Sequence, residues 1–199
     1  MQFRTSTGNP VTSRAHCVVV GVYDKNNLSP SAERLDKTSR GTIKKVLARG
    51  DISGTVGQTL LIQDLRGIQA PRVLLVGLGK PRDLDTPRFL SVLNSAAQAL
   101  AKTQTKQALV CLLEAEVTDR SFAWTSQRLV EQFLESAYRF TEMKGKPPIS
   151  KNSLTRIDLL VDRDDTEDVK EAIRLGKAVA TGVTAHKNIS NLPGNICTP

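Results

Sequence analysis

Aromatic residues and long hydrophobic runs are both scarce in this sequence of 199 residues. Phenylalanine, tyrosine and tryptophan make up 4% of the chain, which disfavours recognition of nucleic acid by base stacking. No segment approaches the roughly 18 consecutive apolar residues that span a membrane. The N-terminus, MQFRTSTGNP, lacks the apolar region of a secretory signal. We therefore expect a cytoplasmic protein that makes no contact with a membrane.

Cysteine and histidine are also scarce, and their spacing predicts no metal or redox site. Cys17, Cys111 and Cys197 form no CxxC pair, and the first two lie in apolar runs, which indicates buried, reduced thiols. His16 and His186 have no acidic or cysteine partner at the spacing of a zinc site. We interpret His16 as a strand-edge residue. His186 is expected near the C-terminal end of a helix, where positive charge is favoured.

The usual catalytic motifs are missing too. The sequence has no GxSxG, and the acidic cluster of Asp162, Asp164 and Asp165 opens a predicted helix, where capping explains it better than metal binding. The segment VGLGK at 76–80 contains GxG, but it lacks the third glycine of a dinucleotide loop and the Ser or Thr of a P-loop. We interpret it as a tight strand exit that requires small residues. No catalytic, metal-binding or cofactor-binding residue is predicted in this chain.

Positive charge is concentrated before residue 162. The net charge is +8, and the six acids and five bases from Asp162 onward leave +9 for residues 1–161. Such an excess attracts phosphate groups, so DNA binding is one hypothesis and an ordinary solvated surface is the other. The bases form three local groups: Lys37, Arg40, Lys44, Lys45 and Arg49; Arg72, Lys80, Arg82 and Arg88; and Arg139, Lys144, Lys146, Lys151 and Arg156.

Hydrophobic periodicity predicts an α/β fold in which helices flank a mixed β-sheet. Strands are predicted over 15–22, 58–64, 72–79, 107–115 and 153–162, and helices over 38–49, 85–102, 121–143 and 164–189. The second and third strands should form an antiparallel hairpin. A helix separates the third strand from the fourth, which predicts a parallel pair joined by a crossover.

The last predicted helix differs from the others in its charge balance and its glycines. Apolar and small residues recur along one side of it: Val169, Ile173, Gly176, Ala180 and Val183. Gly176 and Gly182 would let another backbone approach closely. The chain then ends on NISNLPGNICTP, a stretch without core residues of its own.

Two of these stretches resemble one family. RVLLVGLGK at 72–80, with a buried strand before it and a turn and helix after it, resembles the hallmark of the N-terminal domain of leucyl aminopeptidases. The last helix with KNISNLPGNICTP resembles the segment that leads into the catalytic domain of that family. The positions that correspond to the family pattern are Lys187, Asn188, Ile189, Asn191, Pro193, Asn195, Thr198 and Pro199. Lys187 and Asn188 stand where the family usually has Arg-Asp.

The resemblance implies a division of the chain. Residues 1–163 would form an N-terminal α/β domain similar to the macro-domain fold. Residues 164–199 would form a linking helix and the first segment of a catalytic domain that the sequence lacks. We therefore expect residues 188–199 to pack on that missing domain.

The resemblance also implies an activity for the longer protein. It would be a cytosolic, hexameric metallo-aminopeptidase that removes N-terminal residues, preferentially leucine, from peptides with two manganese or zinc ions. The metal ligands and catalytic residues of the family lie in C-terminal motifs that are absent here, so we expect this chain alone to be inactive and metal-free. Two alternatives remain open: a basic DNA-binding module, and ADP-ribose binding near Gly77 and Gly79.

Overall fold

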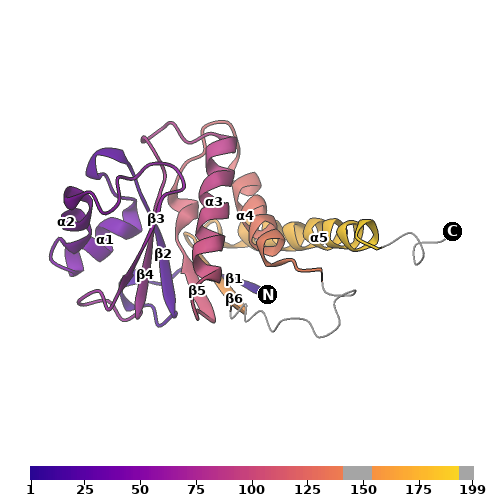
Figure 1. Cartoon of the computed structure of the whole chain (residues 1–199), viewed down its shortest axis with the longest axis horizontal. Helices are drawn as coiled ribbons and strands as arrows, with labels where there is room; N and C mark the ends of the chain where they lie inside the picture. Colours follow the sequence, from indigo (N-terminus) through magenta and orange to yellow (C-terminus); the bar gives the residue numbers. More distant parts are fainter. Residues whose placement is uncertain (141–153, 193–199) are drawn as a thin grey trace.

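The computed structural model describes residues 1–140 and 154–192 as a six-stranded mixed sheet between two layers of helices (Figure 1). The strands are β1 (Gln2–Ser6), β2 (Cys17–Val22), β3 (Thr59–Gln63), β4 (Arg72–Gly77), β5 (Gln107–Val110) and β6 (Arg156–Leu160). The α-helices are α1 (Pro30–Thr38), α2 (Thr42–Arg49), α3 (Thr86–Ala101), α4 (Phe122–Ala137) and α5 (Thr166–Ser190). Within the described ranges, no helix combines the length and apolarity needed to cross a membrane. The predicted α/β class is confirmed.

The strand order is β1-β6-β5-β2-β4-β3. Of the six described strands, β3 alone runs antiparallel to its neighbour, with Leu61 opposite Leu74 of β4, which confirms the predicted hairpin. The predicted pairing of strand 72–79 with strand 107–115 is wrong. β4 and β5 point the same way, but β2 lies between them and bonds to both. The crossover through α3 skips one strand, which sequence order alone does not reveal.

Alternation along β2 explains why helices cover both faces of the sheet. Cys17 and Val19 belong to the core that includes residues of α3, α4 and α5. Val18 and Val20 belong to the core that includes residues of α1 and α2. Successive side chains of a strand point to opposite faces, so an unbroken apolar strand needs cover on both. Figure 1 shows α1 and α2 on one side of the sheet and α3 and α4 on the other.

Local signals fix the ends of several helices. Asp85 accepts a hydrogen bond from the backbone N–H of Arg88 at the start of α3, with 3.1 Å between donor and acceptor. Ser121 accepts one from the backbone N–H of Trp124 at the start of α4, at 3.3 Å. Such caps satisfy N–H groups that have no partner inside the helix. α2 stops at Gly50, whose φ of +83° suits a residue without Cβ.

Two short elements, β1 and α1, were not predicted from the sequence. β1 has one buried apolar residue, Phe3, and becomes a strand through its parallel pairing with β6. α1 directs little more than Ala32 and Leu35 into the core, which is too few for a visible helical period. The start of α1 is marked by Ser29 as the capping residue and by Pro30 in its first turn.

The helix predicted over 38–49 begins only at Thr42.

Two predicted ends are wrong. The strand predicted over 107–115 stops at Val110, and a short 3-10 helix, Leu112–Glu114, follows it. The helix predicted to reach residue 143 stops at Ala137, because the next residue, Tyr138, has an extended backbone. Residues 141–143 lie outside the described part of the chain.

α5 confirms the predicted last helix but differs from the prediction in two details. Asp165 occupies the capping position, yet its side chain makes no capping hydrogen bond, so the predicted capping by this acid is wrong. A Cβ on Gly176 would lie 2.8 Å from the carbonyl oxygen of Gln127 in α4, which confirms the close approach predicted there. A Cβ on Gly182 would meet nothing within 4 Å. The close approach predicted at Gly182 is therefore absent from the described contacts.

Candidate functional site

A cavity of about 260 Å³ lies where the parallel strands β1 and β6 end, and the carboxyl edge of such a sheet is a common ligand site. Its lining includes Arg34, Glu114, Asp162 and Asp165. Glu114 already accepts hydrogen bonds from the backbone N–H of Ser31 at 2.9 Å and from its hydroxyl at 2.6 Å, which fixes the start of α1. Three carboxyl groups against one guanidinium disfavour a phosphate ligand here. Sequence reasoning noted the acids after β6 but not that the fold places them beside a cavity.

The VGLGK turn leads out of β4, and the backbone N–H and carbonyl of Gly79 in it are both hydrogen-bonded. A Cβ on Gly77 would lie 2.0 Å from the carbonyl oxygen of Thr55, and Gly79 has a φ of +79°. The N–H of Gly79 donates to the carbonyl of Gly54 at 2.8 Å, and the carbonyl of Gly79 accepts from the N–H of Asp24 at 2.9 Å. The interpretation as a tight turn that needs small residues is confirmed. ADP-ribose binding near these glycines stays an untested hypothesis.

The two cysteines in the described part of the chain are buried thiols, as predicted. Cys17 and Cys111 are inaccessible to solvent, and each is free. Burial in an apolar environment disfavours the thiolate; it raises the pKa of Cys17 to about 12 and the pKa of Cys111 well above its usual range. Neither sulfur is therefore suited to nucleophilic chemistry. Cys197 lies outside the described residues.

Each of the two histidines has its own local contact. The Nδ1 atom of His16, just before β2, accepts a hydrogen bond from the backbone N–H of Lys106 at 3.3 Å, which confirms a place at the edge of a strand. His186 is exposed in the last turns of α5, as predicted, with its Nε2 atom 3.5 Å from the hydroxyl of Ser190. Across residues 1–140 and 154–192, no three His, Cys, Asp or Glu side chains gather closely enough to hold a metal ion.

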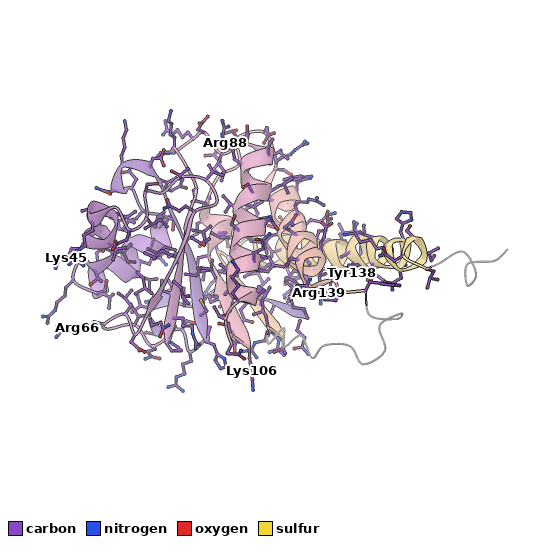
Figure 2. The ribbon with its side chains drawn as sticks, in the orientation of Figure 1. Lys45, Arg66, Arg88, Lys106, Tyr138 and Arg139 are labelled. Atoms are coloured by element: carbon purple, nitrogen blue, oxygen red, sulfur yellow. The ribbon has the colours of Figure 1, made fainter. Side chains whose placement is uncertain are left out.

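The basic groups noted in the sequence lie on different sides of the domain. Arg72 is the first residue of β4, and Lys80 follows the last one. These two members of one group therefore lie at opposite ends of the strand. Arg88 pairs with Asp85 at 2.8 Å. Figure 2 shows Lys45, Arg88 and Lys106 on three different sides of the molecule. DNA binding remains an untested hypothesis.

The ends of α4 and α5 form a polar junction. The amine of Lys187 lies 2.7 Å from a carboxylate oxygen of Glu135 and 5.5 Å from the centre of the Tyr138 ring. The hydroxyl of Tyr138 donates to the Asn188 side chain at 2.9 Å and accepts from the Asn191 amide at 3.3 Å. Figure 2 shows Tyr138 beside the last turns of α5. Three residues of the family pattern therefore bind Glu135 of α4 and Tyr138, the residue that follows this helix.

This junction bears on the expectation about the end of the chain. Asn188 and Asn191 hydrogen-bond with Tyr138, while the packing of residues 188–199 on a catalytic domain stays a prediction. Residues 193–199 lie outside the described part. Sequence reasoning missed Glu135 and Tyr138 because they lie some 50 positions from their partners and no local pattern connects them. The opposite charges of Glu135 and Lys187 are the one feature of the sequence that is consistent with this contact.

The fold and these sites can be compared with known proteins. Residues 19–147 match the family model described as "Cytosol aminopeptidase family, N-terminal domain". The chain belongs to this family. A probable cytosol aminopeptidase of Glaesserella parasuis is 38% identical over 200 residues, which cover all of this chain and 40% of the relative. The chain thus spans about two fifths of the length of the curated relatives that it matches.

Solved structures share the fold of this chain. A tomato leucine aminopeptidase mutant superposes with a TM-score of 0.77 at 20% identity, over all of this chain and 40% of its own. The macrodomain of Mycobacterium tuberculosis DarG superposes with a TM-score of 0.59 at 11% identity, over 81% of this chain and 99% of that one. At these identities the likeness shows the fold alone, and it confirms the predicted similarity to the macro-domain fold.

Proposed function

We propose that this chain is the non-catalytic N-terminal domain of a longer metallo-aminopeptidase. The observation that carries the proposal is the extent of the match: the whole chain aligns with 40% of a probable cytosol aminopeptidase, and residues 19–147 match the N-terminal domain of that family. Its longer form would hydrolyse peptides from the N-terminus, with leucine preferred, as a cytoplasmic homo-hexamer. Residues 1–163 would be the accessory α/β domain, and residues 164–199 would lead into the catalytic part.

The proposal places the metals elsewhere in the longer protein. A pair of divalent ions would supply an activated water and polarise the scissile carbonyl. The residues described here do not fit that role, since they offer no cluster of three metal-ligand side chains. We therefore assign no step of the reaction to this chain.

Activity measurements on two lengths of the protein test the proposal. The longer protein should release p-nitroaniline from leucine p-nitroanilide, and EDTA should abolish the activity until manganese or zinc is restored. The 199-residue chain should hydrolyse nothing above background under the same conditions. Hydrolysis by the 199-residue chain with tightly bound metal would overturn the proposal, and so would a longer protein whose peptidase activity survives metal removal.

A further inference from the structure

The surface of α5 changes character after Arg174. In its first turns, exposed charges pair along the helix: Lys170 lies 2.6 Å from Glu167, and Arg174 lies 2.6 Å from Glu171. Such pairs are typical of a helix face that is in contact with water. From residue 175 to residue 189, Lys177 and Lys187 are the only charged residues, with His186 taken as neutral. The second half of α5 therefore lacks the charges that make its first half a solvated surface.

Apolar and small residues replace the charges on this second half. Four of the five large hydrophobic residues exposed in the described part of the chain lie there, and the most exposed is Ile189, at 58%. These four residues stand at i, i+4, i+8 and i+14, and two small residues stand at i+3 and i+7, which places all six on one helix face. We name this face the α5 stripe: Leu175, Ala178, Val179, Gly182, Val183 and Ile189, all exposed.

The α5 stripe is separate from the face that already has a partner. Val169, Ile173, Gly176 and Ala180 are buried, and the first two belong to the core shared with α3 and α4. Val183, which the sequence placed on the same side, is exposed, so that part of the prediction is wrong. A helix that is apolar on two sides is expected to be covered on both. The open space next to Gly182 would accept the close approach of a second backbone.

We propose that the α5 stripe is the surface on which the catalytic part of the longer protein packs. This inference rests on the proposed function, namely that the chain continues into a catalytic domain. Residues 19–147 match the N-terminal domain of the family, and the chain covers 40% of a relative, which leaves three fifths of that protein outside the match. Figure 1 shows that α5 extends past the sheet with its C-terminal end outermost, so the following polypeptide would begin beside the stripe.

Tethering and size favour this occupant over a second copy of the chain. A segment joined directly to α5 acts at an effective concentration that reaches the millimolar range for short flexible linkers. A stable interface between separate molecules needs about 20–30 residues on each side, whereas the α5 stripe offers six. The six residues of the stripe carry no charge, although Val179 and Val183 also line a small cavity with Arg128, Glu131 and Glu135 of α4.

Cysteine labelling at two positions on α5 tests the inference. Val179→Cys lies within the α5 stripe, and Thr181→Cys lies on the same helix outside it and is also exposed. Trypsin releases residues 178–187 as one peptide that contains either new cysteine and no natural one. Its alkylation by N-ethylmaleimide is followed by mass spectrometry in the 199-residue chain and in the longer protein.

Packing on the stripe should slow the labelling of Val179→Cys about tenfold or more in the longer protein, with Thr181→Cys changed less than about twofold. Equal rates for Val179→Cys in the two proteins would overturn the inference, even if the longer protein is an active peptidase. Protection that rises with the concentration of the 199-residue chain would also overturn it, because a second copy would then be the occupant. Protection in a longer protein without peptidase activity would support the inference and refute the proposed function.

Discussion

At Gly77 the absence of a side chain lets strand β4 end against the loop that carries Gly54 and Thr55. A Cβ there would lie 2.0 Å from the carbonyl oxygen of Thr55, and real Cβ atoms do not approach a backbone oxygen so closely. The N–H of Gly77 donates to the carbonyl of Gln58 at 2.8 Å, so the strand cannot shift without breaking that bond. The glycine of the VGLGK motif is thus explained by packing rather than by ligand binding.

Substitution of Gly77 by alanine should destabilise the domain. The added methyl group overpacks a rigid backbone contact, so we expect Gly77→Ala to lower the free energy of unfolding by about 2 kcal/mol or more. The matched control is Gly182→Ala, where a Cβ meets nothing within 4 Å, and the better helix former should stabilise α5 by up to about 1 kcal/mol. Urea denaturation of both variants measures the two effects. Equal stability of Gly77→Ala and the parent chain would contradict the contact.

Among the elements, the α4–α5 pair depends on both apolar packing and the polar junction at its end. Gly176 brings the two helices close, because a Cβ at this position would lie 2.8 Å from the Gln127 carbonyl. At the far end, Lys187 and Glu135 form an ion pair in which both side chains are a third or more exposed. Exposed pairs contribute little to stability, so the Tyr138 hydroxyl, with two asparagine partners, is the better candidate for holding the end of α5.

Removal of this hydroxyl should loosen the last turn of α5. Tyr138→Phe keeps the ring beside Lys187 but loses the bonds to Asn188 and Asn191, which should cost about 0.5–1.5 kcal/mol. Hydrogen exchange of the amides of residues 188–192 should accelerate, while that of the α3 amides stays unchanged. A double-mutant cycle with Asn188→Ala isolates the bond. A coupling energy near zero would show that Tyr138 does not hold Asn188.

The elements that could be predicted from the sequence are those with strong local signals. α3 was found because Asp85 caps it, a proline occupies its first turn and apolar residues recur at helical spacing. β2 was found because its apolar run is unbroken. β1 and α1 could not be found in this way, since the pairing of β1 with β6 and the packing of α1 on the sheet depend on distant residues. The acidic cavity and the Tyr138 junction depend on distant residues as well.

At the scale of the whole molecule, α5 joins the core of the domain and also continues beyond it. Val169 and Ile173 are buried in the same core as residues of α3, α4 and the sheet. Figure 1 shows the later turns of α5 extending away from the sheet. The proposed division of the chain at residue 163 therefore cuts between the sheet and a helix that packs against it.

Truncation tests this division. A chain that ends at residue 163 loses Val169 and Ile173, and burial of each such side chain stabilises a fold by about 1.5–3 kcal/mol. Because a whole domain has a stability of roughly 5–15 kcal/mol, we expect this truncated chain to unfold at a much lower temperature or to aggregate. A chain that ends at residue 192 keeps every described element and serves as the control. Equal melting temperatures would instead support a domain that ends at residue 163.

Local sequence was enough to predict the α/β class, the β3–β4 hairpin, the N-terminal cap of α3 and the burial of Cys17 and Cys111. These features follow from local periodicity and local hydrogen bonds, which residues close in the sequence specify. Three features could be seen only in the folded structure: β2 lies between β4 and β5, Tyr138 binds the end of α5, and the α5 stripe is exposed. Each of these depends on which distant surfaces meet, because residues far apart in the sequence come together only in the assembled fold.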